Sequence, residues 1–318
     1  MTSDARLRCV VNDLVFQNPI VLAAGTAGYG EELQGVMRLD VLGGFVTKAV
    51  SLEPRHGAPA PRVAEFPGGM INAVGLANPG LEDVCAEQIP WMAAHLPSVR
   101  KIVNVVGFTV GEFPAVIAGL EATLAAEGSG AAVDAYELNV SCPNTEAGGM
   151  EFGADPTALA AVVRRSRAET RRPLFVKLSP TLTNIGDAAR IAADAGADAI
   201  TVVNTLPGLV VDVERRRPAL GFGTGGVSGS AILPIGVLAT WKVSRAVKLP
   251  ILGLGGVAKG TDAMQYIVAG ASLVGVGTAA MRDPRAPERI IHELAAWCEQ
   301  HRVGNIHDLT GTLEWPHP

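Results

Sequence analysis

The sequence has few cysteines and few aromatic residues, and these shortages exclude several kinds of site. The four cysteines, Cys9, Cys85, Cys142 and Cys298, are scattered among 318 residues. No two of them have the spacing of zinc ligands or of a redox pair, so we expect no metal or iron–sulfur cluster held by this chain alone. Aromatic residues make up only 5% of the chain, so the core is expected to be built from Ala, Val, Ile and Leu.

The chain also lacks concentrated charge and long apolar runs. Its net charge is -5 with a pI near 5.7, and no run of Lys and Arg exceeds Arg215–Arg217, which argues against nucleic-acid binding. Apolar stretches such as Ile232–Ala239 are too short to span a bilayer. Since no secretion signal precedes them, we expect a soluble cytoplasmic protein without disulfides or a membrane anchor.

Short apolar runs alternate with Ala-rich helical patterns along the chain. The runs are unbroken Val, Ile and Leu rather than alternating apolar and polar residues, which is typical of strands buried on both faces of a parallel sheet. The predicted strands are Pro19–Ala24, Gly44–Val50, Lys101–Val106, Ala135–Val140, Leu174–Leu178, Ala199–Val203, Ile251–Gly255 and Leu273–Val276. The predicted helices are Leu81–Leu96, Pro114–Ala126, Pro156–Thr170, Ile185–Ala195, Gly236–Ala246, Thr261–Ala269 and Pro287–His301.

This alternation predicts a (β/α)8 TIM barrel that forms a single domain over residues 1–318. An open doubly wound sheet is the alternative, but the segment Gly25–Gly30 after the first strand lacks the Gly-x-Gly-x-x-Gly spacing expected there. Two Gly- and Pro-rich insertions, Ser51–Pro79 and Leu206–Leu233, interrupt the alternation after strands. We interpret them as inserted loops at the C-terminal face, where barrel active sites lie.

Polar side chains gather at the carboxyl ends of the predicted strands. Because strand ends meet at one face of a barrel, these side chains are expected to converge on a charged, hydrogen-bonding ligand. They are Lys48, Asn104, Asn139, Cys142, Lys177, Asn204 and Thr205. Lys177 stands between apolar residues, so it needs a partner or has a perturbed pKa, and Schiff-base chemistry remains open for it.

Glycines close the last two predicted strands, in Gly253-Leu254-Gly255-Gly256 and Gly275-Val276-Gly277-Thr278. Exposed backbone N–H groups at these two loops form the phosphate site of many barrels. Glycine also serves simply to make tight turns. Since both final loops carry the pattern, we expect a phosphorylated ligand.

One segment, Asn139-Val140-Ser141-Cys142-Pro143-Asn144, places a thiol between two carboxamides directly after a strand. A cysteine can act as a base or nucleophile once it loses its proton, and the amides can hold a planar polar substrate against the sulfur. A small buried cysteine in a turn is the plainer interpretation. Its position at a strand end, with two lysines and a phosphate site, favours the catalytic one.

This segment, together with Thr47-Lys48-Ala49 and the run Asn72 to Gly80, closely resembles class 1 dihydroorotate dehydrogenase, a flavin enzyme of pyrimidine biosynthesis. The resemblance extends from Leu14 to about Leu313, and the segment Gly148–Gly153 is similar to the class 1B branch. Class 2 members have Ser in place of the Cys and carry an N-terminal membrane segment. Two positions depart from the family pattern: Ala24 stands where many members have Ser, and Ala58 where Asn is common.

The resemblance implies which residues bind FMN and substrate. FMN would contact Ala24, Lys48, Ala49, Asn104, Asn139, Lys177 and Val203, with its phosphate on Gly229, Gly255, Gly256, Gly277 and Thr278. Dihydroorotate would contact Lys48, Asn72, Ala73, Val74, Gly75, Leu76, Asn139, Asn144, Asn204 and Thr205. Cys142 and Lys177 would be catalytic: the thiolate removes the C5 proton while hydride passes from C6 to N5 of FMN, and the ammonium stabilises the reduced flavin.

Class 1B resemblance further implies a partner subunit that carries FAD and a [2Fe–2S] cluster and passes electrons to NAD, around a homodimer core. Fumarate or a quinone remains open as the final acceptor. Three other functions remain open as well. They are a dihydropyrimidine dehydrogenase-like flavin enzyme, a flavin-free phosphate-sugar aldolase or synthase that uses Lys177 as an amine, and a barrel that only binds ligands.

Overall fold

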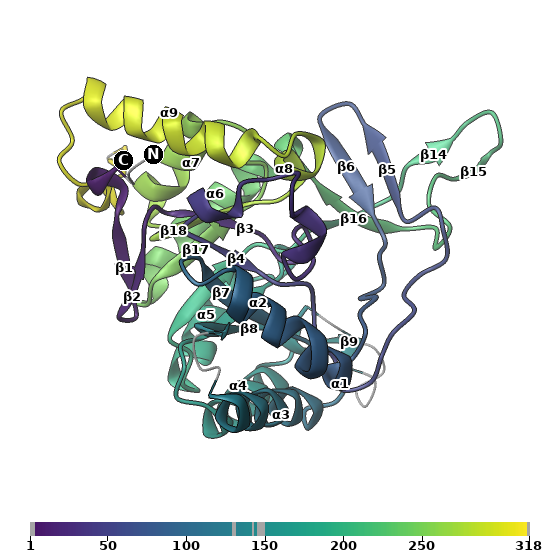
Figure 1. The fold of residues 1–318 in the computed structure, drawn as a ribbon. Helices are drawn as coiled ribbons and strands as arrows, with labels where there is room; N and C mark the ends of the chain where they lie inside the picture. Colours follow the sequence, from purple (N-terminus) through teal and green to yellow (C-terminus); the bar gives the residue numbers. More distant parts are fainter. Residues whose placement is uncertain (1–3, 129–131, 142, 145–149, 317–318) are drawn as a thin grey trace.

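Eight parallel strands form a closed barrel in the computed structural model, which describes residues 4–128, 132–141, 143–144 and 150–316. The strands pair in chain order around the barrel, and this confirms the predicted (β/α)8 fold (Figure 1). They are β3 (Ile20–Leu22), β4 (Gly44–Val46), β7 (Arg100–Val105), β8 (Ala135–Asn139), β11 (Leu174–Leu178), β12 (Ala199–Val202), β17 (Ile251–Leu254) and β18 (Leu273–Val276).

Helices cover the outside of the barrel. The main ones are α3 (Glu112–Glu127), α4 (Pro156–Glu169), α5 (Ile185–Asp194), α6 (Leu233–Ala246), α7 (Gly260–Ala269), α8 (Thr278–Arg282) and α9 (Ala286–Gln300). Asp155 caps α4 by accepting hydrogen bonds from the Thr157 and Ala158 amides, as its position before Pro156 predicts. Short 3-10 helices are Ala5–Leu7, Glu31–Leu33, Leu39–Val41, Phe152–Ala154, Ser230–Ile232 and Ile306–Leu309.

The structure confirms the predicted helix Leu81–Leu96 and divides it into three consecutive helical pieces. These are α1 (Leu81–Asp83), a π-helical turn over Val84–Gln88 and α2 (Ile89–His95). Pro90 lies at the start of α2, where its ring cannot donate a hydrogen bond and would clash with the carbonyl four residues before it. The wider π turn accommodates that ring, since it lets the Ile89 amide donate to the Val84 carbonyl instead.

One apolar residue from each strand fills the inside of the barrel. They are Val21, Val46, Ile102, Ala135, Phe175, Ala199, Leu252 and Leu273. The hairpin of β1 (Cys9–Val11) and β2 (Leu14–Phe16) packs on this cluster. The hairpin is hydrogen-bonded to the start of β7, where Arg100 Nε donates to the Val15 carbonyl at 2.8 Å. The hairpin therefore closes the amino-terminal end and leaves the carboxyl end for a site.

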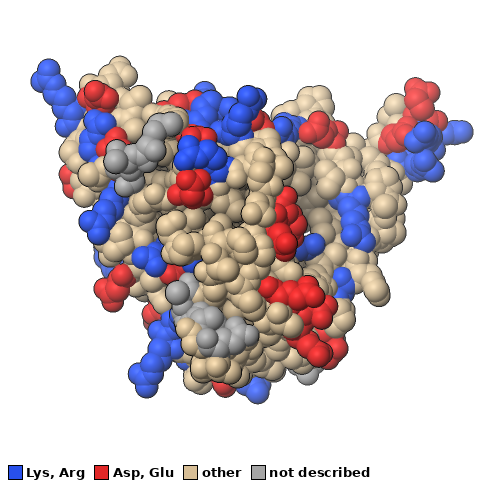
Figure 2. Space-filling view, in the orientation of Figure 1, with Lys and Arg blue, Asp and Glu red and all other residues tan. Residues whose placement is uncertain are grey.

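The two insertions lie at the carboxyl end of the barrel, as expected, and they contain strands as well as loops. They pair with each other into a four-stranded antiparallel sheet in the order β13 (Leu206–Gly208), β16 (Gly225–Ser228), β6 (Gly69–Asn72) and β5 (Val63–Phe66). A hairpin of β14 (Val211–Asp212) and β15 (Arg217–Pro218) extends from it, away from the barrel (Figure 1). Its tip carries charges of both signs (Figure 2), and no helix among the described residues is long and apolar enough to cross a membrane.

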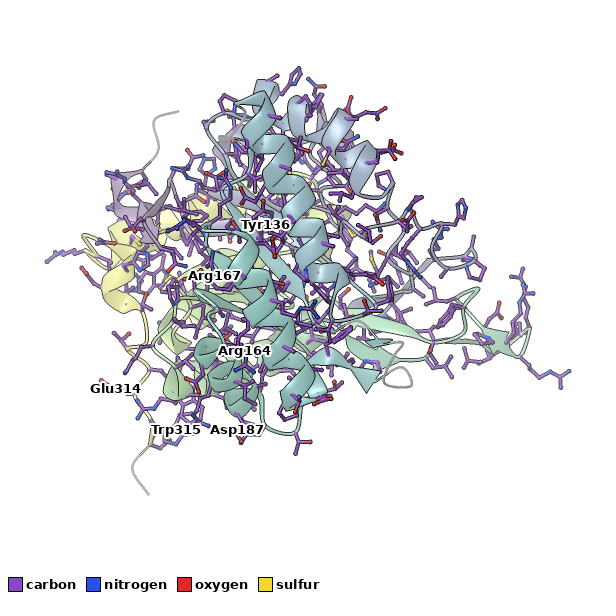
Figure 3. The ribbon with its side chains drawn as sticks, turned by 90° about the horizontal axis from the view of Figure 1, so that it is seen from below. Tyr136, Arg164, Arg167, Asp187, Glu314 and Trp315 are labelled. Atoms are coloured by element: carbon purple, nitrogen blue, oxygen red, sulfur yellow. The ribbon has the colours of Figure 1, made fainter. Side chains whose placement is uncertain are left out.

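The chain ends on the outside of the barrel. Trp315 stacks on Trp241 of α6 with ring centroids 4.2 Å apart, and Figure 3 shows this terminal segment at the edge of the molecule. The same view labels Tyr136 of β8, which lies under the surrounding helices in the apolar layer between them and the barrel. Tyr136 and its neighbour Glu137 therefore point to opposite sides of the strand, as the alternation of a strand requires.

Candidate active site

A cavity of about 340 Å³ lies at the carboxyl ends of the barrel strands. Polar side chains from several strands converge on it: Asn104 from β7, Asn139 from the end of β8, Lys177 from β11, and Lys48 from the segment after β4. We call it the first cavity. The structure thus brings together the predicted polar strand ends other than Cys142, which is not described, at the face where barrels hold their ligands.

The charge of the first cavity has one sign. Among the described residues that line it, the charged ones are Lys48, Lys177 and Arg282, and no Asp or Glu is among them. A lining with cations and no acidic residue favours an anionic ligand, such as one that carries a phosphate or a carboxylate.

Lys177 is the charged residue of the first cavity that is buried. Its residue is 5% exposed, and its ammonium forms no hydrogen bond or ion pair with any described residue. An ammonium removed from water without a partner is costly, so a ligand of the cavity must supply the acceptor. Next to it in the β11–β8 register lies Asn139, whose Oδ1 accepts a hydrogen bond of 3.4 Å from Asn204 Nδ2.

Glycine-rich loops line the other end of the first cavity. Gly229 follows β16, Gly255 and Gly256 follow β17, and Gly277 with Thr278 follows β18. Gly256 has a φ of +77°, and a Cβ there would lie 2.7 Å from the Leu233 amide nitrogen, so only glycine fits. Bare backbone at three adjacent loops suits a phosphate group.

Sequence reasoning missed Arg282 at this end of the cavity. Its Nε donates to Glu65 Oε1 at 2.9 Å, and its Nη2 donates to the Gly69 carbonyl at 2.8 Å. Arg282 therefore connects α8 to the β5–β6 hairpin of the first insertion. Arg282 lies four residues after Thr278, which is about one turn along the helix that begins at the Gly277 loop. This spacing was the available signal in the sequence.

A second cavity adjoins the first and shares part of its lining. Both are lined by Asn72, Val74, Leu76, Asn204 and Thr205, while Ala73 and Gly75 line only the second. All seven were assigned to the substrate by the resemblance. The segment that contains them is tight, because a Cβ on Gly75 (φ +70°) would lie 2.4 Å from the Ala58 amide nitrogen. Ala58, where Asn is common in the family, lines the second cavity too.

Three polar residues of the second cavity, Ser141, Glu151 and Ser179, were not selected from the sequence. Burial raises the pKa of the Glu151 carboxyl, and a hydrogen bond from Ser179 acts in the opposite direction. Ser179 Oγ in turn lies 2.6 Å from Thr181 Oγ1 at the surface. Glu151 lies within the segment Gly148–Gly153, which resembles the class 1B branch, and this was the available signal for it, whereas no motif marked Ser179.

The predicted catalytic residue Cys142 lies outside the described residues, and so does the side chain of Asn144. The described chain around them is β9 (Pro143–Asn144), which pairs antiparallel with β10 (Met150–Glu151). The buried thiols elsewhere are poor candidates for a base, because burial raises the pKa of Cys9 to about 12 and also raises the pKa of Cys298.

The remaining predicted cofactor contacts also lie around the first cavity. Ala24 and Ala49 line it beside Lys48, and Val203 lines it beside Asn204. Hence every described residue assigned to FMN by the resemblance borders this cavity. Apart from Asn144, whose side chain is not described, the residues assigned to the substrate border the first cavity, the second or both.

The family model named dihydroorotate dehydrogenase matches residues 6–297 of this chain. The chain belongs to the dihydroorotate dehydrogenase family. The match includes all eight barrel strands and both insertions. The residues of the two cavities therefore belong to the part of the chain that defines this family.

Individual relatives in the dihydroorotate dehydrogenase family match nearly the full length. A relative from Pelobacter propionicus is 44% identical over 95% of this chain and 96% of its own, and one from Trichlorobacter lovleyi is 43% identical over 96% and 97%. Both are named dihydroorotate dehydrogenase B (NAD(+)), catalytic subunit. A relative from Solibacter usitatus, 43% identical over 98% and 99%, is provisionally named dihydroorotate dehydrogenase A (fumarate).

Proposed function

We propose that this protein oxidises dihydroorotate to orotate in pyrimidine biosynthesis, with FMN as its bound cofactor. The observation that carries the proposal is the pair of adjoining cavities. One has cations and a glycine-rich end, as a flavin phosphate requires, and the other is lined by the segment that the resemblance assigns to the substrate. The residues shared by both cavities lie where a cofactor and a substrate would meet.

The residues of the first cavity fit FMN. The glycine loops offer backbone N–H groups for the phosphate, and Asn104, Asn139 and Lys177 offer hydrogen bonds to the polar edge of a flavin ring. When bound, FMN supplies a two-electron acceptor. Lys177 would hold a positive charge where the reduced cofactor carries a negative one, and this preorganised charge is a large catalytic term.

The second cavity fits the substrate. Asn72, Asn204 and Thr205 provide amide and hydroxyl groups for a planar ring with carbonyl and N–H edges. Cys142 would take the C5 proton of dihydroorotate, and Ser141 beside it lines this cavity. Holding the ring between the cofactor and the thiol supplies the proximity that proton abstraction needs.

We further propose that electrons leave through a second subunit with FAD and a [2Fe–2S] cluster, which reduces NAD. The names of the Pelobacter and Trichlorobacter relatives, each a catalytic subunit of an NAD(+) enzyme, support this. The described residues contain no group of three or more His, Cys, Asp or Glu side chains that could hold a metal ion, so a cluster would come from the partner. We also propose a homodimer of this chain as the core of that assembly.

Anaerobic reduction of the purified protein tests the proposal. We expect a yellow protein whose visible flavin band is bleached by dihydroorotate and is not bleached by dihydrouracil. A colourless protein that takes up no FMN, or a flavin that dihydroorotate leaves oxidised, would overturn the proposed function. Reduction by dihydrouracil instead would favour the dihydropyrimidine dehydrogenase-like alternative.

Reoxidation of the bleached protein then identifies the acceptor. If the partner subunit is required, the isolated chain should return electrons slowly to NAD and quickly once that subunit is added. Rapid reoxidation by fumarate, without a partner, would contradict the NAD-linked proposal and agree with the name of the Solibacter relative.

A further inference from the structure

A buried carboxyl group lies beneath the first cavity. Glu137 is an inward-facing residue of β8, only 1% exposed, and its register partner on β7 is Asn104, which is fully buried. Glu137 is not part of the described lining of either cavity, so it does not itself meet a ligand. Asn104 does line the first cavity and therefore stands between Glu137 and whatever fills it.

The hydrogen bond between the two side chains orients the Asn104 amide. Asn104 Nδ2 donates to Glu137 Oε1 at 2.7 Å, while Asn104 Oδ1 is buried and has no hydrogen-bond partner. The bond fixes which way the amide faces, because turning the amide over would place its oxygen instead of its nitrogen against Glu137 Oε1. The Asn104 oxygen is thus the amide atom that stays available to accept a hydrogen bond.

The backbone of Asn104 is fixed as well. Its amide nitrogen donates to Thr47 Oγ1 at 3.1 Å, which ties β7 to the segment that carries Lys48. A buried amide oxygen without a partner is costly, and its cost is removed when a ligand donates to it. The pair is therefore built for a ligand with an N–H or O–H group at this point.

The remaining groups around Glu137 do not replace this role. On β11, the strand on the other side of β8, the register partner of Glu137 is the apolar Phe175. Lys177 is the next inward-facing residue along β11. No ion pair joins Lys177 to Glu137 in the described part of the chain. Asn104 is accordingly the one described side chain that hydrogen-bonds to the Glu137 carboxyl.

We propose that Glu137 is a positioning residue for the flavin: it fixes Asn104 with its carbonyl toward the first cavity, so that the site accepts a hydrogen bond from the bound cofactor. The inference rests on the proposed function, because it takes FMN as the ligand. The oxidised flavin ring carries one N–H and its side chain carries hydroxyl groups, and either can serve as the donor.

A set of three variants tests this role by titrating the apoprotein with FMN. E137Q keeps the size of the side chain, but the introduced amide can donate as well as accept a hydrogen bond. The Asn104 amide is then free to turn over, and we expect FMN affinity to fall about 10-fold or more. N104D places two carboxylates together and should reduce affinity further. In the double variant N104D/E137Q, the amide introduced at position 137 can donate to the carboxylate introduced at position 104. That carboxylate again presents an acceptor to the cavity, so most of the FMN affinity should be restored.

A structural role alone predicts a different pattern. E121Q is the matched control, since Glu121 is a half-buried carboxylate of α3 that accepts hydrogen bonds from Thr170 and Arg172 away from both cavities. It should alter thermal stability without changing FMN affinity or the visible flavin spectrum. E137Q should change both affinity and spectrum.

The outcomes separate this inference from the proposed function. If the unaltered protein binds FMN and E137Q binds it equally tightly with the same spectrum, the role of Glu137 is refuted while the proposed function stands. If E137Q does not fold, the double variant provides the test: should it bind FMN no better than N104D does, the role of Glu137 is refuted. If the unaltered protein binds no FMN, both proposals fail.

Discussion

Thr278 Oγ1 donates a hydrogen bond of 2.8 Å to Ser228 Oγ, and this bond joins two loops that are 50 residues apart in the sequence. Thr278 begins α8 after the last barrel strand, whereas Ser228 ends β16 of the inserted sheet. Both line the glycine-rich end of the first cavity. The glycine-rich end of the first cavity is therefore completed by an insertion and not by the barrel alone.

Replacing Thr278 with valine should weaken FMN binding. T278V keeps the shape of the side chain but removes the hydroxyl that joins the two loops and can also contact a phosphate. We expect the dissociation constant to rise about 5- to 30-fold, as the loss of one or two hydrogen bonds predicts. Flavin fluorescence during titration of the apoprotein measures it.

T312V is the control for this change. Thr312 is an exposed threonine whose hydroxyl donates to the Leu309 carbonyl at 2.8 Å, outside both cavities. It should leave FMN affinity unaltered. Equal affinities for T278V and the unaltered protein would show that the bond to Ser228 does not contribute to the cofactor site.

Replacing Cys142 with alanine should separate binding from chemistry. C142A should retain FMN, yet its reduction by dihydroorotate should slow by roughly two to four decades, a typical loss for a general base. Stopped-flow absorbance of the flavin band measures the rate. Unchanged reduction kinetics would rule out the thiol as the base.

Replacing Lys177 with methionine should raise the stability of the apoprotein and slow the reduction of the flavin. K177M removes a nearly buried ammonium that has no partner among the described residues, so the apoprotein should become more stable, by about 1 kcal/mol. Flavin reduction should slow by about 100-fold or more, since the variant loses a preorganised charge. Urea unfolding and stopped-flow absorbance measure the two effects, and a destabilised apoprotein would indicate a structural lysine.

Lys101 is the matched contrast, because it is buried but has partners. Its Nζ donates to the Leu96 carbonyl at 2.8 Å and lies 3.8 Å from Asp134 Oδ2, outside both cavities. K101M leaves the buried Leu96 carbonyl without this donor and removes the nearby charge from Asp134, which keeps Arg100 as its partner, and should destabilise the protein by about 1–3 kcal/mol. The flavin spectrum and its reduction rate should stay unchanged.

The contribution of Lys101 should also depend on pH. Burial lowers the pKa of its ammonium, an effect that the charge of Asp134 opposes. Between this lowered pKa and the ordinary value of 10.5, the unfolded chain binds more protons at Lys101 than the folded chain, so its contribution to stability rises with pH. The stability difference between the unaltered protein and K101M should thus be larger at about pH 10 than at about pH 7, as urea unfolding at both values would show.

The barrel was predictable because its strands carry local signals. Segments such as Leu174–Leu178 are apolar apart from a polar residue near the carboxyl end, here Lys177. Such residues face the cavity because the direction of the strand places them there. The inserted sheet was not predictable in this way. Strands such as Gly225–Ser228 are short and glycine-rich, and they become strands by pairing with Gly69–Asn72, more than 150 residues away.

The sequence by itself determined the barrel, the glycine loops and the set of lysines and amides, since these depend on local composition and strand order. Only the tertiary structure decided that Glu137 hydrogen-bonds to Asn104, that Arg282 and Ser228 line the first cavity with the glycine loops, and that two cavities share a border. These features depend on which side chains meet across strands and insertions distant in the chain. Register and packing set such contacts, and no local pattern encodes them.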